Sequence, residues 1–483
     1  RNVFVAAGYQ TAAISKLLKA NLLSLPSVAE LPEMLRRTDG GSPFETFVRL
    51  FVLGVSAEVD AVRRALDPMN PDVWAKAGML AIDGETVTAT LRLLPFQGLL
   101  VATESVADTG ARRPDFVLGI SRSTLTLGGF TIRRRVRRML DLGTGCGFQA
   151  LLAAKHCEHV HATDRNTRAI AFARFNACLN GYSNIAFSVG DLFEPVRGEL
   201  FDLVTTNPPF VISPESAYIY RDSGMSVDQF VRKTVCEVPK YLEDGGYFQM
   251  ICNWAHVGQQ KWQARLGEWF AGTGCDAWVI RRQTQTPWDY TRVWCDAGKT
   301  PQQSSDDFER WMAYYKREGI GAISTGFIMM RRRRAPTNWF RADDWTERLQ
   351  EETGNDVLEG FGNQDFLESA RDDAALLNAR LRVSPRVRLE QQCQPSNGVW
   401  RCVGARVHRV GGLNCSGSVD PLMAGLIVRC DGKRPLGELL SELPISQETD
   451  GGLIRSPLLA AIRRLIARGI LLPPTSQLAE PRA

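Results

Sequence analysis

The fold is indicated by one stretch of sequence, Asp141-Leu142-Gly143-Thr144-Gly145-Cys146-Gly147, which follows an apolar segment and precedes a helix-like one. Glycine adopts backbone conformations that other residues avoid, and without a Cβ it lets the chain approach a ligand closely. Such a loop after a strand is typical of α/β proteins that bind a nucleotide-containing cofactor. Three glycines in one loop are weak evidence by themselves, so the flanking sequence has to decide.

Strand-like and helix-like segments alternate around this loop, from about residue 115 to residue 335. This alternation predicts a doubly wound α/β domain with a mainly parallel sheet. The segments that we expect to be strands are 139–142, 160–163, 185–189, 201–205, 246–252 and 323–330. Helices are expected between the early strands, for example over 149–155 and 168–179.

Acidic residues stand at the ends of the next two predicted strands. Asp164 ends the second strand, and Asp191 follows the third. The carboxyl ends of parallel strands meet at one edge of a sheet, so we expect both residues to lie near Asp141. In such folds the acid after the second strand accepts hydrogen bonds from ribose hydroxyls. Asp191 is placed to meet an adenine amino group.

The fourth predicted strand leads into Asn207-Pro208-Pro209-Phe210. An amide or aryl amino nitrogen is a poor nucleophile because its lone pair is delocalised. If Oδ1 of Asn207 and the carbonyl oxygen of Pro208 each accept one N–H, that nitrogen is fixed in place. The prolines restrict φ and remove competing N–H donors, and Phe210 can stack on a planar group. An ordinary turn after a strand is the alternative interpretation of this motif.

The glycine loop, the three acids and the Asn-Pro-Pro-Phe motif together resemble the class I S-adenosylmethionine-dependent methyltransferases. Within that class the chain is similar to the small-domain group, which methylates planar nitrogens and includes HemK-like and N6-adenine-type N-methyltransferases. The run from Asn207 to Pro214 is most similar to the HemK-like protein glutamine methyltransferases. Phe210 stands where tyrosine is commoner in that group.

The resemblance implies a Rossmann-like sheet of seven strands, S-adenosyl-L-methionine as cofactor, and no metal. It implies that the substrate nitrogen is presented by Asn207, Pro208, Pro209 and Phe210. It implies that the cofactor is held by Asp141, Gly143, Thr144, Gly145, Gly147, Asp164, Arg165, Asp191, Leu192 and Asn207.

The resemblance leaves both ends of the chain unexplained. Residues 1–114 are expected to form a helical N-terminal domain that ends in a β-hairpin, and residues 115–335 the methyltransferase domain. Residues 336–483 are expected to form a C-terminal region. The N-terminal domain and residues 417–473 both have the pattern of a winged-helix-like unit. For the N-terminal domain, a helical cap on the next domain is an equal alternative.

Composition restricts the class of protein further. The 483 residues include eleven scattered cysteines and contain no apolar run of membrane-spanning length, which favours a cytoplasmic protein with reduced thiols. The formal net charge is +5, and Arg133, Arg134, Arg135, Arg137 and Arg138 precede the first predicted strand. Such a basic run is compatible with an anionic partner and also with a solvated surface. The sequence does not predict an oligomeric state.

The sequence leaves two kinds of methyl acceptor possible for the predicted transfer. The basic flanks favour an amino group of a nucleic acid base in rRNA, tRNA or DNA. The similarity around Asn207 favours a glutamine amide of a translation-related protein. The alternative from another class is a non-catalytic protein that senses the cofactor and binds nucleic acid, although such a protein has no need of the Asn-Pro-Pro-Phe geometry.

Overall fold

The computed structural model describes residues 1–22, 29–105, 113–295, 300–347, 353–443 and 451–474, with backbone only for 451–455. By the contacts between its residues, the chain divides into two compact units. The first comprises Arg1–Gly128 and Arg135–Asp344, and the second comprises Gly129–Arg134 and Trp345–Ala483. Among the described residues, no helix is long and apolar enough to cross a membrane.

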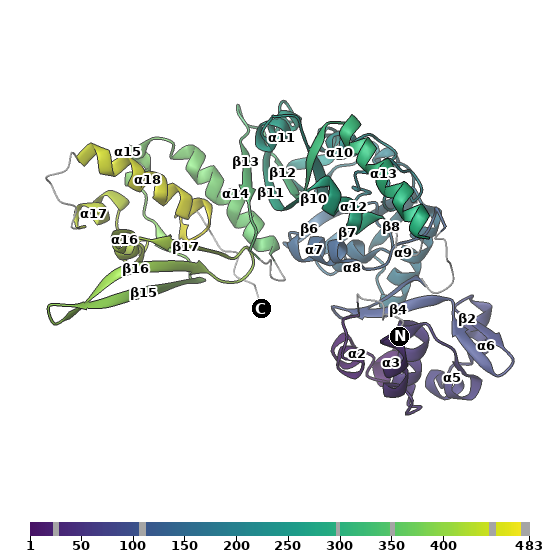
Figure 1. Cartoon of the computed structure of the whole chain (residues 1–483). Coiled ribbons are helices and arrows are strands. Elements are labelled where there is room, and N and C mark those ends of the chain that lie inside the picture. Colours follow the sequence, from purple (N-terminus) through teal and green to yellow (C-terminus); the bar gives the residue numbers. More distant parts are fainter. Residues whose placement is uncertain (23–28, 106–112, 296–299, 348–352, 444–450, 475–483) are drawn as a thin grey trace. The chain divides into compact units, whose positions relative to one another are not determined.

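The first unit is built on a sheet of eight strands in the order β13-β11-β12-β10-β9-β6-β7-β8 (Figure 1). The strands are β6 (Val136–Leu142), β7 (Cys157–Asp164), β8 (Ile185–Val189), β9 (Phe201–Thr206), β10 (Leu242–Val257), β11 (Cys275–Gln285), β12 (Ile320–Arg332) and β13 (Phe340–Asp344). Strands β8, β7, β6, β9 and β10 are parallel, whereas β12 is antiparallel to both of its neighbours.

The predicted α/β class and all six predicted strands are confirmed. The expected seven strands are present within residues 115–335, as β6 to β12. The eighth strand is β13, which pairs in parallel with β11 at the edge of the sheet and lies beyond the expected boundary at residue 335. Strand β11 also escaped prediction, because its sequence turns polar over Arg281–Gln285.

Helices cover both faces of this sheet. They are α7 (Arg122–Phe130), α8 (Phe148–Ala153), α9 (Thr167–Asn180), α10 (Gln229–Glu237), α11 (Trp262–Phe270), α12 (Pro287–Trp294) and α13 (Pro301–Arg317), with short turns η2 (Glu194–Val196) and η3 (Val238–Tyr241). Side chains alternate along a strand. Accordingly Cys252 of β10 lies in the core under α10 and α11, whereas Ala255 lies in the core under α12 and α13.

The N-terminal elements belong to the same unit as this sheet. They are α1 (Asn2–Ala6), α2 (Thr11–Leu18), α3 (Leu31–Arg37), α4 (Pro43–Val48), the π-helical turn η1 (Arg49–Leu53), β1 (Ala57–Glu58), α5 (Val59–Leu66), α6 (Pro71–Lys76), β2 (Leu80–Asp83), β3 (Thr86–Ala89), β4 (Leu91–Phe96) and β5 (Leu99–Glu104). The small sheet of order β1-β3-β2 beside α5 and α6 is compatible with a winged helix. The N-terminal elements also share a hydrophobic core with α8 and α9, which is compatible with a helical cap. Both interpretations stay predictions.

Two asparagines join the β4–β5 hairpin to the central domain. Asn176 and Asn180 lie one turn apart on α9. The side-chain amide of each accepts one hydrogen bond from, and donates one to, the backbone of a single residue of β5. Asn176 accepts from the N–H of Ala102 at 2.7 Å and donates to its carbonyl oxygen at 2.9 Å. Asn180 makes the same pair of bonds to Leu100, at 3.0 and 2.8 Å. The amides thereby satisfy backbone groups of β5 that would otherwise be buried without a partner.

The second unit combines helices with a small antiparallel sheet of order β15-β16-β17. Its elements are α14 (Gly354–Ser369), α15 (Asp373–Leu377), β14 (Arg382–Val383), β15 (Val387–Ser396), β16 (Val399–Arg409), β17 (Cys415–Val419), α16 (Pro421–Arg429), α17 (Leu436–Ser441), α18 (Gly451–Ala467) and β18 (Leu471–Leu472). Buried Arg409 bonds Asp356 and Glu359 at 3.2 and 2.6 Å. The winged-helix interpretation of 417–473 stays a prediction.

Candidate active site

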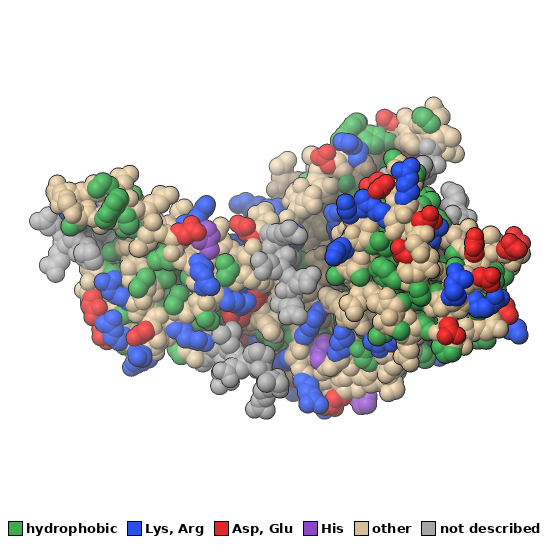
Figure 2. Space-filling model, turned by 90° about the horizontal axis from the view of Figure 1, so that it is seen from below, with side chains coloured by type: hydrophobic (Ala, Val, Ile, Leu, Met, Phe, Trp, Pro, Cys, Tyr) green, Lys and Arg blue, Asp and Glu red, His purple; other side chains and the backbone are tan. Residues whose placement is uncertain are grey.

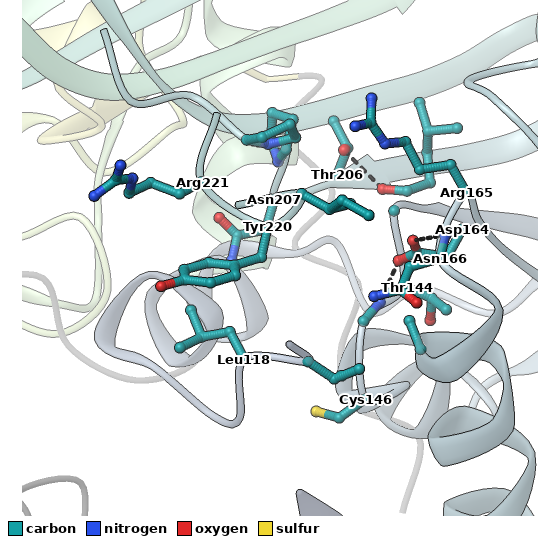
Figure 3. Close-up of a pocket in the computed structure, with 18 of the residues that line it drawn as sticks. Leu118, Thr144, Cys146, Asp164, Arg165, Asn166, Thr206, Asn207, Tyr220 and Arg221 are labelled. Carbon is teal, nitrogen blue, oxygen red and sulfur yellow. Dashed lines mark hydrogen bonds between the residues drawn. The ribbon is translucent and has the colours of Figure 1, made fainter. Parts of the chain in front are cut away.

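A pocket opens at the carboxyl ends of β6, β7 and β9, where the predicted site residues meet (Figure 3). Side chains and backbone of all but one of them line it, namely Asp141, Gly143, Thr144, Gly145, Asp164, Arg165, Asp191, Leu192, Asn207, Pro208, Pro209 and Phe210. Asp191 and Arg165 are exposed at its rim, whereas Asp141 is buried. The structure thus brings together residues that are up to 69 positions apart in sequence; their individual roles remain predictions.

The glycine loop has the backbone conformation that its sequence predicts. Gly143, Gly145 and Gly147 have φ angles of 72°, 55° and 85°, in the region that favours glycine. The N–H groups of Gly143 and Thr144 both donate to the carbonyl oxygen of Thr163 at 2.9 Å, which holds the loop against the end of β7. Gly147 is the predicted residue that does not line the pocket. A Cβ there would lie 3.0 Å from Ala173 of α9, so Gly147 serves close packing.

Asp141 holds the loop from inside the protein. Its Oδ2 accepts hydrogen bonds from the Thr144 hydroxyl at 2.6 Å and from the N–H of Ala150 at 3.0 Å. Burial raises the pKa of Asp141 to about 7, although these two hydrogen bonds favour a lower pKa. The nearby Asp164 adds to the rise. A cation bound in the pocket would favour the ionised form of this carboxyl group.

Asp164 presents a carboxylate to the pocket from the end of β7. Its two oxygens accept from the N–H groups of Gly145 and Asn166, both at 2.9 Å. Each carboxylate oxygen has a second acceptor position, so two more donors such as ribose hydroxyls can be bound. Burial raises the pKa of Asp164 as well. These two acids and the glycine loop fit S-adenosylmethionine, whose sulfonium is cationic and whose ribose offers two hydroxyl donors.

Asn207 lies at the other end of the pocket, directly after β9. Its Nδ2 donates to the hydroxyls of Ser123 and Thr124 at 3.2 and 3.4 Å. Its Oδ1 is buried, and no described residue donates a hydrogen bond to it. Buried amide oxygens are nearly always hydrogen-bonded in folded proteins. An unpaired oxygen here is therefore the feature expected of an acceptor that waits for a substrate N–H.

Aromatic residues surround this end of the pocket, and the sequence identified Phe210 but none of the others. Phe210 meets Trp294 of α12 edge to face, with ring centroids 6.4 Å apart. Phe116, Tyr220 and Phe230 also line the pocket; Tyr220 is drawn with Asn207 in Figure 3. These residues come from four separate segments of the chain, so no local pattern could have connected them.

The segment after Phe210 is fixed by a buried ion-pair network. Arg221 is nearly inaccessible, and its guanidinium bonds both Asp222 and Glu215. Glu215 also accepts from Trp311 of α13 at 3.0 Å. Because buried charges that lose a partner are costly, this network holds the wall of the pocket in one position.

The part of the arginine run that belongs to the first unit lies near the amino end of β6, away from the pocket. Arg137 and Arg138 open β6, whose carboxyl end carries Asp141, and Arg138 pairs with Glu199. Arg137 and Asp141 are four residues apart on this strand, which corresponds to roughly 13 Å. On the face seen in Figure 2, Lys and Arg side chains are interspersed with Asp and Glu. Within the described residues, no group of acidic, histidine and cysteine side chains could hold a metal.

Three segments of the chain match family models. Residues 123–273 match the methyltransferase small domain. Residues 6–90 and 358–473 match two domains of unknown function, DUF7059 and DUF7782. Each of these segments falls inside one of the three regions expected from the sequence, whose boundaries remain predictions.

Curated relatives resemble the central part of the chain. A release factor glutamine methyltransferase from Xylella fastidiosa is 35% identical over 135 residues, which cover 24% of this chain and 47% of the relative. A putative protein N5-glutamine methyltransferase from Methanocaldococcus jannaschii is 32% identical over 120 residues, 23% of this chain and 60% of the relative. Ribosomal RNA small subunit methyltransferase C from Alcanivorax borkumensis is 28% identical over 116 residues, 24% of this chain and 32% of the relative.

The chain spans about half the length of the first of these relatives. Among solved structures, a methyltransferase from Pyrococcus furiosus aligns over 43% of this chain and 80% of its own, with 17% identity and a TM-score of 0.27. The family match to residues 123–273 coincides with the strands and loops that form the pocket. This part of the chain is therefore a class I S-adenosylmethionine-dependent methyltransferase domain of the small-domain group.

Proposed function

We propose that the chain transfers a methyl group from S-adenosylmethionine to a planar amino or amide nitrogen of a macromolecule. The observation that carries this proposal is the buried, unpaired Oδ1 of Asn207 in the same pocket as Asp141 and Asp164. A protein that only senses the cofactor would gain nothing from such an oxygen, because an unmet buried acceptor destabilises the fold.

The chain's own residues would act on the acceptor nitrogen. Oδ1 of Asn207 and the carbonyl oxygen of Pro208 accept its two N–H groups and encourage its lone pair to point towards the cofactor. When bound, S-adenosylmethionine supplies an electrophilic methyl group. Orientation of the two reactants provides most of the acceleration, and the nitrogen loses its proton only as the new bond forms. Phe210, supported by Trp294, covers the flat face of the acceptor.

A glutamine amide of a translation-related protein is the first candidate acceptor. Two of the relatives described above carry glutamine methyltransferase names, with 35% and 32% identity. The basic run favoured a nucleic acid in the sequence, but its residues Arg137 and Arg138 lie near the start of β6, at the end of the strand away from the pocket. A short amide side chain needs no phosphate contacts near the site.

An amino group of a nucleic acid base is the second candidate. The relative named as a ribosomal RNA methyltransferase supports it, and so does the aromatic lining formed by Phe116, Phe210, Tyr220 and Trp294. Aromatic side chains stack on bases whatever the base sequence. Such a wall also accommodates the smaller amide plane, so the wall alone does not decide between the two acceptors.

The test is methyl transfer from labelled cofactor into purified ribosomes and into a protein fraction that contains translation factors. The glutamine candidate requires label that protease releases and nuclease does not. The base candidate requires the reverse. If wild-type protein binds the cofactor but labels neither fraction, the proposal of methyl transfer to the translation machinery is contradicted.

A further inference from the structure

The orientation of the Asn207 side chain decides whether it can bind a substrate N–H at all. An amide has an acceptor oxygen on one side and an amino group on the other, and the two differ only by a half turn. With Oδ1 towards the acceptor nitrogen the contact is attractive. With Nδ2 there instead, two donors would face each other. Something in the protein has to select the first orientation.

Two hydroxyls on the first turn of α7 are placed to make this selection. Ser123 Oγ and Thr124 Oγ1 lie 3.2 and 3.4 Å from Nδ2 of Asn207, and both residues are half-buried in the pocket wall. An amino group carries two protons, so it can serve both oxygens at once. A reversed amide would need two hydroxyl protons at the same two places.

The protons of these hydroxyls are largely committed elsewhere. Ser121 Oγ lies 2.9 Å from both Ser123 Oγ and Thr124 Oγ1, and it accepts from the N–H of Thr124 at 3.2 Å. Once Ser121 donates to one neighbour and accepts from the other, a single hydroxyl proton is left. The cluster can therefore accept two bonds from Asn207 more easily than it can donate two to it.

The start of α7 is itself held in place from the cofactor side. Gln149 of α8 is buried, and its Nε2 donates to the carbonyl oxygen of Thr124 at 2.7 Å. Gln149 directly precedes Ala150, whose N–H bonds Asp141. The hydroxyls that hold Asn207 thus rest on the same helix that closes the glycine loop.

We propose that Ser123 and Thr124 are positioning residues, which hold the Asn207 amide with Oδ1 towards the acceptor nitrogen. The effect of this positioning on catalysis rests on the proposed function, whereas the orientation of the Asn207 amide itself does not. Loss of both hydroxyls frees the amide to rotate and leaves the carboxylates of the cofactor site untouched.

The test compares three variants of the full chain. Ser123→Ala combined with Thr124→Val removes both hydroxyls at little change in volume. Thr124→Ser keeps the hydroxyl and loses only a methyl group. Thr126→Val is the matched control, because this hydroxyl lies on the same helix but donates to the carbonyl oxygen of Arg122 at 2.7 Å. Melting temperatures of all three confirm that the variants are folded.

The first measurement is the side-chain NH2 signal of Asn207 in 15N-labelled protein, identified by its loss in Asn207→Asp. We expect its protons to exchange with water roughly tenfold faster in the double variant, because two hydrogen bonds are lost. The signal should stay unchanged in Thr126→Val. An unchanged exchange rate in the folded double variant would overturn the proposal.

The second measurement is the initial rate of label transfer into the fractions used above, with cofactor affinity by calorimetry. The double variant should lose roughly tenfold or more in rate, as for other groups that orient a reacting partner, with cofactor affinity within about twofold. Thr124→Ser should stay within about threefold of wild type. Full activity despite faster exchange would overturn the positioning role. If wild type labels nothing, the proposed function fails and the exchange measurement alone decides this inference.

Discussion

The two ends of the pocket are built in different ways. At the cofactor end, Asp141 and Asp164 are bonded by groups no more than 19 positions away in sequence, namely Thr144, Gly145, Ala150 and Asn166. At the acceptor end, Asn207 is held by hydroxyls 84 and 83 positions away, and its oxygen has no partner among the described residues. Under the proposed function, the carboxylates of the cofactor end are already held by hydrogen bonds in the folded chain, whereas Oδ1 of Asn207 gains its partner only from a substrate.

This difference explains which part of the site can be predicted from the sequence and which part cannot. A short motif can encode a site whose bonds are local, so the glycine loop and its acids were predicted from the sequence. A site whose side chains are oriented by distant segments needs the tertiary structure. If the comparison is sound, changes at the two ends should affect different measurements.

The largest effect is expected at Asn207. In Asn207→Ala the acceptor nitrogen loses the oxygen that fixes it, so methyl transfer should fall by about 100-fold or more, mainly in kcat. Cofactor affinity, measured by calorimetry, should stay near that of wild type because Asp141 and Asp164 are unchanged. A variant that keeps more than about a tenth of the wild-type rate would show that Asn207 does not position the nucleophile.

A smaller but still clear effect is expected at Asp164. In Asp164→Ala the N–H groups of Gly145 and Asn166 lose their acceptor, and two ribose hydroxyls would lose theirs. Cofactor binding should weaken by about tenfold or more, since charge-assisted hydrogen bonds contribute roughly 1.5–3 kcal/mol. Calorimetry with S-adenosylmethionine checks this. Asp244→Ala is the control, because Asp244 is an exposed aspartate near the start of β10 and does not line the pocket. An unchanged affinity would remove Asp164 from the cofactor site.

The sequence predicted the parallel half of the sheet better than the antiparallel half. Strand β8 has the predicted bounds, and β6, β7 and β9 each extend their predicted segments by no more than three residues at either end. The predicted segments are short and mostly apolar, and they are followed within two residues by Gly143, Asp164, Gly190 and Asn207. Strands β11 and β13 were missed, since β11 carries Arg281 and Arg282 within it and β13 is an edge strand with two aspartates.

The candidate site shows the same division. The residues at the carboxyl ends of β6, β7, β8 and β9 were predicted, whereas Ser123, Thr124 and Trp294 were not. A Ser-x-Ser-Thr run at a helix start is common, because hydroxyls there cap N–H groups, as Ser121 does for Thr124. Its proximity to Asn207 follows from the packing of α7 against the end of β9, which no local pattern encodes.

The pH dependence of cofactor binding tests the cofactor end again. Burial raises the pKa of Asp141 to about 7, so below that pH the carboxyl group is neutral in the free protein. A cationic cofactor favours the ionised form, so binding should release a proton and affinity should rise with pH until about 7. Between pH 8 and pH 6 we expect a loss of up to about tenfold.

The measurement is calorimetry at pH 6, 7 and 8 in two buffers of different ionisation enthalpy, which reports the released proton directly. Asp141→Asn should bind more weakly and lose most of this dependence, because the amide does not titrate. A flat profile in wild-type protein would mean that Asp141 does not exchange its proton when the cofactor binds.

The smallest effect is expected from Arg137, at the edge of the sheet away from the pocket. Its side chain is 70% exposed, and its ion-pair partner Glu243 lies 3.9 Å away. Exposed pairs at such distances contribute about 0–1 kcal/mol, so Arg137→Ala should leave stability, cofactor affinity and label transfer nearly unchanged. The log–log dependence of acceptor binding on salt should also keep its slope, since a substrate in the pocket does not reach the start of β6.

A nucleic acid that wraps around the domain would behave differently, because each lost phosphate contact flattens the slope by about 0.7–0.9. A flatter slope in Arg137→Ala, together with label that nuclease releases, would therefore show that the acceptor is a nucleic acid that extends beyond the pocket, and would count against the glutamine amide as the first candidate.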